Sequence, residues 1–347
     1  MSMQLGEKMQ RKQFIKNIMI DKKLDAVLIY SDTKNFAFDL AINNLQPVLF
    51  HYYFITEKED GYLEIDYLLE NIPKNFKIIP INEENTVNDL HKFLKQFKRI
   101  GLVGNAPWRH LNKIESQIID ITDEAQKILL QKEQTEIDQI KTSAKIISQT
   151  LDSLEISLFK EKTEKNLEKH LRKKLLENSE ELAFPICITS GKEIKLTTAS
   201  FPSENKIEDI VIIDAGVIKN GFYSDCTRMF FLNNQEAENN YKKLKQVHYS
   251  VIKKISIGTT LGEIVKLYIE KLNDAGLPGK TLEVQDLGHS IGFYLHEQPI
   301  FFKPEQENFK LLENMIITLE PEISFENYRL RIEDMVLIKK IPEIITI

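Results

Sequence analysis

Hydrophobic residues in the first third of the chain fall into short runs separated by polar stretches. A charged, helix-like stretch extends to about Lys23, and a second helical pattern occupies the segment TVNDLHKFLKQF, residues 86–97. Four apolar runs have the length and composition of strands: Asp25–Ser31, Val48–Thr56, Phe76–Ile81 and Arg99–Gly104. This alternation of strands and helices predicts an α/β domain with a mostly parallel sheet over residues 1–123.

The pattern changes to longer helical periods in the remainder of the chain. Residues 124–134 are polar and are expected to form a linker helix. Thr135 is expected to cap the N-terminus of an amphipathic helix, in which apolar residues recur every three or four positions. Further helices are predicted at Lys162–Ser179, from about Glu236 to Ile257, and before Gly276, with strand-like segments between them. This pattern predicts an α+β domain over residues 135–347.

Composition excludes several classes of function. The 347 residues are 42% hydrophobic and 28% charged, which is ordinary for a soluble globular protein. A net charge of −6 favours neither nucleic acid nor an anionic membrane as partner. No apolar run approaches the roughly 18 residues of a membrane-spanning helix, and the charged N-terminus lacks a secretory signal. Two cysteines, Cys187 and Cys226, are too few for a disulfide framework, so a cytoplasmic location is expected.

Two acidic residues are expected to lie close together, which needs a chemical explanation. The stretch IIDAGVIKNGFYSDCTR, residues 212–228, places Asp214 and Asp225 on neighbouring extended segments that are separated by a glycine-bearing turn. Like charges repel at close range, so two carboxylates that share a site need a proton or a cation between them.

Further groups that can bind metal follow in the last third of the chain. His289 lies in DLGHSIGFYLHEQP, Glu320 ends an apolar strand-like run, and Glu333 lies in LRIEDMVLI. Each is more simply a turn or surface residue when taken alone, but together with Asp214 and Asp225 they supply four carboxylates and one imidazole. Such a set can bind two divalent cations, with manganese, cobalt, iron or zinc as suitable metals. Two metals about 3.5–4 Å apart can hold a hydroxide and stabilise charge on an attacked carbonyl, which is a mechanism for hydrolysis.

The order of these motifs resembles the pita-bread metallopeptidases. The matching pieces are IDAG, GFYSDCTR, GHSIG followed by HEQP, LEP and RIED, which together cover roughly residues 185–338. The chain is most similar to the branch of Xaa-Pro aminopeptidases and prolidases. The resemblance implies a pita-bread (creatinase/aminopeptidase-like) catalytic domain at residues 135–347, preceded by the α/β domain at residues 1–123 that is typical of this branch.

The resemblance also implies that these residues bind two divalent metal ions, for which manganese, cobalt and zinc are candidates. Asp214 would bind one ion, and His289 with Glu320 would bind the other. Asp225 and Glu333 would bridge the pair.

Catalytic and substrate roles follow from the same resemblance. Glu320 would also move the proton, His296 would contact the substrate near the scissile carbonyl, and Arg331 would support Glu333. The implied substrate is a short peptide with proline at its second position, and the implied reaction is hydrolysis of the bond before that proline. Relatives of this kind are commonly homodimers, so a homodimer is expected by analogy.

The chain departs from the family pattern at one active-site position. Family members carry another histidine in the segment that here runs between Gly191 and Asp214, which contains no histidine. Counting from either end puts the expected histidine at Thr197 or Thr198. Smaller departures leave the metal ligands unchanged: Ser290, Glu322 and Ser324. Loss of a hydrogen-bonding or acid–base group lowers rates by roughly 10²–10⁴, so a slow enzyme or one of altered specificity is expected.

Two other functions are compatible with these departures. The first is a non-catalytic module that binds peptides or partner proteins on the same fold. The second is hydrolysis of a small non-peptide C–N bond, as in the creatinase-like relatives. Retention of all five ligands argues against both.

Overall fold

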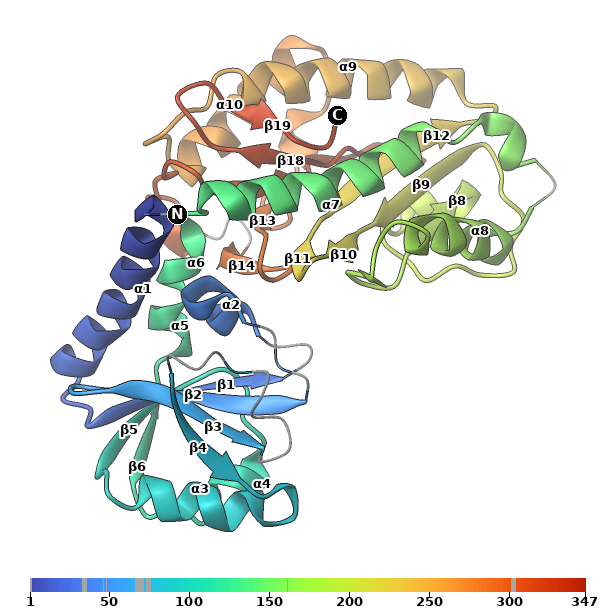
Figure 1. Ribbon diagram of the computed structural model, residues 1–347. Helices are drawn as coiled ribbons and strands as arrows, with labels where there is room; N and C mark the ends of the chain where they lie inside the picture. The colour runs from blue at the N-terminus through green and yellow to red at the C-terminus, as the bar shows by residue number, and fades with distance from the viewer. Residues whose placement is uncertain are drawn as a thin grey trace. The chain divides into compact units, whose positions relative to one another are not determined.

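The chain divides into two compact units, Met1–Leu129 and Leu130–Ile347, which are described separately (Figure 1). The computed structural model describes residues 2–347 apart from 33–35, 46, 48, 66–71, 73–75, 161 and 301–303. In place of the linker helix expected over 124–134, the chain forms the short helices α5 (Thr122–Ala125) and α6 (Lys127–Leu130). The helical pattern ends there because the N–H of Lys132 donates to the carbonyl of Asn314 at 3.0 Å instead of to a preceding turn.

The first unit is built on a mixed sheet with the strand order β4-β3-β2-β1-β5-β6 in its described part. The pairs β1–β5, β5–β6 and β3–β4 are parallel, whereas β1–β2 and β2–β3 are antiparallel. The strands are β1 (Ala26–Asp32), β2 (Phe50–Thr56), β3 (Asp60–Ile65), β4 (Lys77–Ile81), β5 (Arg99–Val103) and β6 (Gln117–Asp120).

The expectation of a mostly parallel sheet is confirmed, because β2 alone among the described strands of this sheet runs against the others. The apolar pattern did not reveal the hairpin that β2 forms with β3. Strand β3 returns directly after β2, and the N–H of Thr56 closes the tight connection by donating to the carbonyl of Glu59 at 2.8 Å. Because β3 begins with Asp60 and contains Glu64, its sequence lacks the apolar run that marked the other strands. Short connections of this kind join antiparallel strands.

Helices cover both faces of this sheet. Helices α1 (Ser2–Asp21) and α2 (Ala37–Asn43) contact β1. Helix α3 (Thr86–Leu94) buries Leu90 and Leu94 in a core with Leu28 and Phe54 of the sheet. The short helix α4 (Trp108–Leu111) contacts α3. The arrangement is that of an α/β layer structure.

One buried polar cluster ties this unit together. His51 of β2 contacts Asp39 of α2 through Nε2 and Glu64 of β3 through Nδ1, the latter at 3.0 Å. The hydroxyl of Tyr62 donates to Asp39 at 2.6 Å. Burial lowers the pKa of His51, but its contacts with Asp39 and Glu64 outweigh burial and raise the pKa to about 9. The imidazole is therefore charged at neutral pH and holds two buried carboxylates.

The second unit has four long helices in its described residues: α7 (Gln134–Asp152), α8 (Glu164–Leu176), α9 (Gln235–Ile252) and α10 (Leu261–Asp274). The amphipathic helix expected before Leu154 is confirmed as α7, but Thr135 lies inside it and is not its cap. Glu133 is the N-cap, and its N–H donates to the side chain of Glu136 at 2.7 Å, as in a capping box. Helix α10 ends before Gly276, whose φ of 69° closes the helix.

Several small antiparallel sheets lie between these helices. Their orders are β12-β9-β8, β11-β10-β7, β14-β13-β15-β18-β19 and β16-β17. The strands are β7 (Glu181–Leu182), β8 (Cys187–Ser190), β9 (Ile210–Ala215), β10 (Val217–Lys219), β11 (Phe222–Tyr223), β12 (Cys226–Phe231), β13 (His289–Ser290), β14 (Glu297–Ile300), β15 (Ile316–Leu319), β16 (Glu322–Ser324), β17 (Arg329–Arg331), β18 (Asp334–Leu337) and β19 (Glu343–Ile344). Helix α7 lies along β10 and β11, and α9 contacts β12 and β17 (Figure 1).

Strand β9 separates the two cores of this unit. Val211 and Ile213 pack in a core with α7 and α8, whereas Ile210 and Ile212 pack in a core with α9 and α10. A strand buried on both faces has a continuous apolar run instead of an alternating one. Since side chains alternate along a strand, Asp214 continues the face of Ile210 and Ile212. This face is directed toward the part of the unit that contains β15 and β18.

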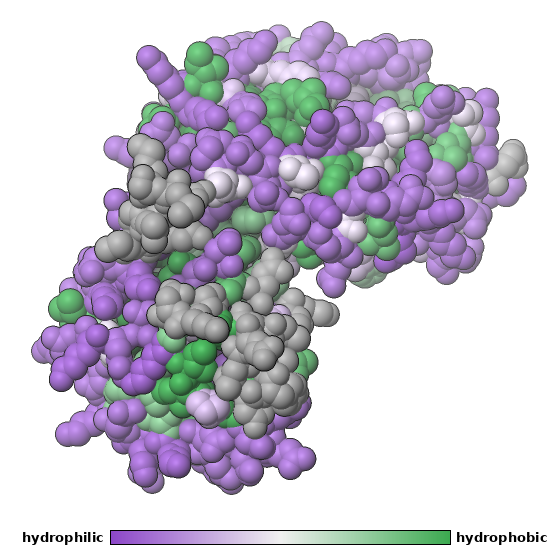
Figure 2. All heavy atoms as spheres, viewed as in Figure 1, coloured by the Kyte–Doolittle hydropathy of each residue, from purple (hydrophilic) through white to green (hydrophobic). Residues whose placement is uncertain are grey.

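The surface of the second unit fits this arrangement of cores. Figure 2 shows mostly hydrophilic residues on the face that carries α7 and α9, with hydrophobic residues scattered among them. Within the described ranges, no helix combines the length and apolarity needed to cross a bilayer.

The His51 cluster predicts a pH-dependent stability. Because the folded-state pKa is raised from 6.5 to about 9, the stabilisation is complete below about pH 6.5 and is lost as the pH rises through about 9. A shift of this size corresponds to about 3 kcal/mol. Urea unfolding at about pH 6 and about pH 10 should show a larger loss of stability in the wild type than in His51→Gln. Equal losses in the two proteins would contradict the assignment.

Candidate metal centre

Two strands position the first pair of acids. Asp214 lies near the end of β9, directly opposite Thr227 in the antiparallel pairing with β12. Asp225 immediately precedes β12 and is buried. Its neighbour Cys226 packs in the core with α7 and α8, so the two side chains point to opposite faces. The two acids therefore converge from adjacent segments of one sheet.

A second sheet supplies the other two acids. Glu320 follows β15 and Glu333 precedes β18, and these strands pair Leu319 with Asp334. The N–H of Glu320 donates to the carbonyl of Leu287 at 2.9 Å, and that of Glu333 donates to the carbonyl of Thr227 at 3.3 Å. The contact with Thr227 connects the two sheets at the point where the four carboxylates meet.

His289 is oriented by its own backbone surroundings. Its N–H donates to the Thr318 hydroxyl at 3.1 Å, and its Nδ1 donates to the carbonyl of Ser290 at 3.1 Å. A carbonyl oxygen only accepts, so Nδ1 carries a proton and Nε2 is the ring nitrogen directed at the acids. Nε2 lies 3.7 Å from Asp225 and 3.8 Å from Glu320. This orientation is the one that a metal ligand requires.

Several carboxylate oxygens of this site have no hydrogen-bond partner, and Arg331 is the one permanent cation among the described residues that line the pocket. Oxygens of Asp214 (Oδ1), Asp225 (Oδ1) and Glu333 (Oε1) are buried and accept no hydrogen bond from the described residues. Burial and the neighbouring carboxylates raise the pKa of Asp225 and of Glu333 well above ordinary values. Burial also raises the pKa of Asp214 and brings that of Glu320 to about 7. Buried polar atoms without partners are rare and mark a missing proton or cation.

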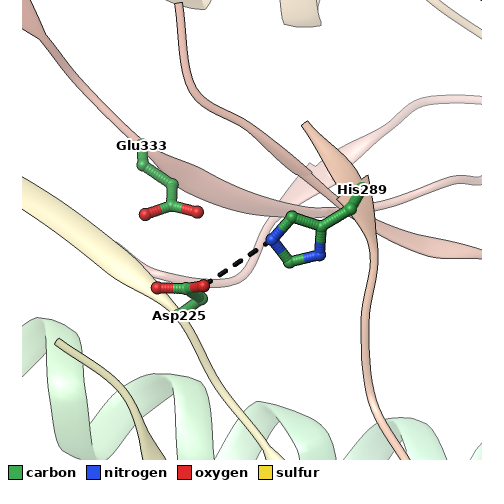
Figure 3. A group of neighbouring side chains, drawn as sticks. All are labelled: Asp225, His289 and Glu333. Atoms are coloured by element: carbon green, nitrogen blue, oxygen red, sulfur yellow. Dashed lines mark ion pairs between the residues drawn. The ribbon is translucent and has the colours of Figure 1, made fainter. Parts of the chain in front are cut away.

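These groups fit divalent metal. Asp225, His289 and Glu333 each present a ligand atom, and the three atoms lie within 4.8 Å of one another. Figure 3 shows the two carboxylates facing each other and the imidazole pointing toward Asp225. Oxygen-rich sites with an imidazole suit manganese, cobalt, iron or zinc, and facing carboxylates can bridge two ions. A divalent cation held by these groups would account for the unpartnered oxygens.

The centre opens into a pocket of about 300 Å³. The seven side chains that the motifs predicted as ligands, catalytic groups or supports all line it: Asp214, Asp225, His289, His296, Glu320, Arg331 and Glu333. Four other residues that the motifs did not indicate also line it: Phe184, Cys187, Asp286 and Leu295. Cys187 reaches the site because the β8–β9 register pairs it with Asp214. Such a register cannot be read from the motifs alone.

His296 and Arg331 contact different members of the ligand set. The ring of His296 meets that of His289 edge-on, with centroids 4.4 Å apart. Desolvation and the nearby His289 lower the pKa of His296 to about 4, so this imidazole is neutral at pH 7. Arg331 approaches Glu320 at 3.4 Å and Asp214 at 4.0 Å. In this geometry it supports Glu320 more directly than Glu333, the residue that the motifs suggested.

The two threonines at the position of the expected histidine have different surroundings. Thr198 is buried and donates its hydroxyl to Glu322, which in turn binds Arg331. Thr197 is only partly buried and donates to the carbonyl of Ala199 at 3.1 Å. Neither threonine lines the pocket in the described part of the chain. Thr198 is therefore the one that reaches the site, through Glu322 and Arg331.

Comparison with known proteins relates this geometry to a family. The sequence profile described as metallopeptidase family M24 matches residues 138–340. The chain is 28% identical over 292 residues to an uncharacterized peptidase of Methanocaldococcus jannaschii, an alignment that covers 81% of this chain and 79% of that protein. It is 24% identical over 351 residues to the Xaa-Pro dipeptidase of Pyrococcus horikoshii, with 97% and 95% of the two chains covered.

A solved structure extends the likeness over both units. The prolidase from Pyrococcus horikoshii OT3 superposes with a TM-score of 0.81 at 21% identity, covering 97% of this chain and 98% of that chain. This confirms the fold class predicted from sequence, an α/β N-terminal domain followed by an α+β pita-bread domain. It also confirms the resemblance to the Xaa-Pro branch.

Charge repulsion in the centre predicts an unusual effect of mutation. A carboxylate whose folded-state pKa is raised destabilises the fold at pH values where it must ionise. Asp225→Asn should therefore raise the thermal midpoint of the metal-free protein, by roughly 2–4 °C for each kcal/mol of relief. The same variant should lose the further rise that Mn²⁺ produces in the wild type. Thermal unfolding with and without Mn²⁺ measures both effects.

Glu164→Gln provides the matched control for this experiment. Glu164 is as buried as the ligands, but it accepts hydrogen bonds from the Ser190 hydroxyl at 2.8 Å and the Ser203 hydroxyl at 2.7 Å. Its neutralisation should lower the midpoint and leave the response to Mn²⁺ intact. A metal-free Asp225→Asn protein that melts well below the wild type would refute the explanation by repulsion.

Proposed function

Because the chain belongs to metallopeptidase family M24, we propose that it is a dinuclear metallo-exopeptidase that hydrolyses the peptide bond before proline. The observation that carries this proposal is the set of carboxylate oxygens without hydrogen bonds on Asp214, Asp225 and Glu333 beside His289, whose Nε2 faces Asp225 and Glu320. The likeness of the chain to the Xaa-Pro dipeptidase of Pyrococcus horikoshii supports the bond before proline as the one that is cut.

The ligand roles are proposed from the geometry and the motif resemblance together. Asp214 would bind one divalent ion and His289 with Glu320 the other, while Asp225 and Glu333 would bridge them, with manganese, cobalt or zinc as candidates. The facing carboxylates of Asp225 and Glu333 support their bridging role (Figure 3). When bound, the ions would supply Lewis acidity to the scissile carbonyl and to the attacking water.

Other side chains would handle protons and orient the substrate. Glu320 would take a proton from the water and return it to the leaving nitrogen, as general acid–base groups do. Its position is held by Arg331, whose guanidinium lies 3.4 Å from it. His296, neutral at pH 7, can hydrogen-bond the substrate near the scissile carbonyl without adding positive charge beside the ions.

The size of the pocket supports a short substrate. A volume of about 300 Å³ lies at the lower end of the range for small-molecule sites. Such a space fits a dipeptide or the first residues of a peptide better than a long extended segment. Phe184 and Leu295 add apolar surface against which a proline ring can pack.

Two alternatives are less well supported. A non-catalytic binding module on the same fold is not favoured, because it gives no reason for five converging metal-competent groups. Cleavage of a small non-peptide C–N bond has no observation of its own. The homodimer and the cytoplasmic location expected from sequence stay predictions.

A peptide panel tests the activity directly. After loading with Mn²⁺ or Co²⁺, the wild type should contain about two ions per chain and release the N-terminal residue from Xaa-Pro dipeptides or tripeptides. Asp225→Asn and Glu333→Gln should lose metal and activity together, since each removes a proposed bridge. Failure of the metal-loaded wild type to cut any peptide of the panel would rule the proposal out.

The absent histidine gives a second prediction. Thr198→His should raise turnover on Xaa-Pro peptides by at least tenfold, because position 198 lies beside the Glu322–Arg331 pair that borders the centre. Thr197→His should have little effect, since residue 197 faces the backbone of Ala199. A gain in Thr197→His alone would reverse the assignment of the position.

A further inference from the structure

Glu322 is a buried acid that stands outside the pocket and yet connects to it. It begins β16 and pairs with Arg331 of β17 in the antiparallel register. Its Oε2 accepts from Arg331 through Nε at 3.0 Å and through a terminal nitrogen at 2.9 Å. Arg329 donates to Oε1 at 2.8 Å, and the Thr198 hydroxyl donates to Oε2. Every oxygen of this carboxylate is therefore engaged.

Arg331 extends this contact to the metal centre. While Nε and one terminal nitrogen bind Glu322, the other terminal nitrogen lies 3.4 Å from Glu320 and 4.0 Å from Asp214. A guanidinium is planar and rigid, so fixing two of its nitrogens also fixes the third. The orientation of Arg331 toward Glu320 and Asp214 thus depends on Glu322.

The orientation of Arg331 affects cation binding because its guanidinium is positively charged. Arg331 is buried beside carboxylates that are proposed to bind metal, and its positive charge opposes the entry of a cation. Glu322 is 2% exposed and compensates for this charge from the side away from the pocket. Without that compensation, the guanidinium would pair more closely with Glu320 and Asp214 and would compete with the metal for their oxygens.

We propose that Glu322 is a positioning residue of the metal centre, which holds Arg331 in place and offsets its charge so that Glu320 and Asp214 stay available to metal. Thr198 supports Glu322 by donating its hydroxyl. The inference rests on the proposed metal-binding function of this site. It revises the expectation that the departure at residue 322 leaves the metal ligands unaffected. It also joins two departures from the family pattern, at residues 198 and 322, into one structural unit.

Metal affinity of the metal-free full-length chain tests this role without any peptide. Manganese binding, measured by equilibrium dialysis, should weaken by about 10–100-fold in Glu322→Gln, the range typical for groups that orient metal ligands. Glu322→Asp keeps the charge but withdraws it from Arg331, and should lie between the wild type and Glu322→Gln. Thr198→Val should weaken binding only a few-fold, because Arg329 and Arg331 still bind Glu322.

The Glu164→Gln control separates an effect on the position of Arg331 from a general loss of protein stability. Glu164→Gln removes a carboxylate that is equally buried, at 2% exposed, but has no contact with Arg331. It should lower the thermal midpoint while keeping the manganese affinity of the wild type. Equal weakening in Glu164→Gln and Glu322→Gln would overturn the proposal, because it would reduce the effect to general destabilisation.

The remaining outcomes are also decisive. Wild-type affinity in a folded Glu322→Gln protein refutes the role of Glu322 and leaves the proposed peptidase function standing. If Glu322→Gln does not fold, wild-type affinity in both Glu322→Asp and Thr198→Val refutes it instead. Lack of manganese binding by the wild type would overturn the proposed function, and this inference with it.

Discussion

Mutual repulsion among four carboxylates is the constraint around which the second unit is built. Asp214 and Asp225 come from one sheet, and Glu320 and Glu333 flank paired strands of another. Burial prevents water from relieving the repulsion, so their pKa values rise and three of their oxygens lack hydrogen-bond donors among the described residues. Such a cluster destabilises the fold unless cations join it, and function at this site therefore opposes stability.

The surrounding structure limits this repulsion without removing it. The backbone contact between Glu333 and Thr227 holds the sheets together, so the acids cannot move apart. His289 is held by the bond from Nδ1 to the carbonyl of Ser290 and directs Nε2 toward the acids. Arg331 supplies the permanent positive charge among the described residues that line the pocket, and Glu322 offsets it from behind. The negative charge that remains can be balanced by protons or by a bound cation.

Local patterns predicted where helices and strands occur better than they predicted which residues pair with or cap them. Helix α7 and strands β1, β4 and β5 follow from apolar spacing, which depends on neighbouring residues alone. Three details of the first unit and of the start of α7 escaped the sequence pattern, and only the last of them depends on a residue far away in the chain. Strand β3 lacks an apolar run and pairs through a hairpin, Glu133 instead of Thr135 caps α7, and Asn314 interrupts the linker helix at Lys132.

The same division applies to the site. The sequence by itself determined which groups can bind metal, because short motifs place Asp214, Asp225 and their partners at the ends of apolar runs. Only the tertiary structure decided that Cys187 lies beside Asp214, and that Thr198 rather than Thr197 reaches Glu322 and Arg331. These contacts join residues up to 124 positions apart. Strand register and burial create them, and neither is encoded in the spacing of any one motif.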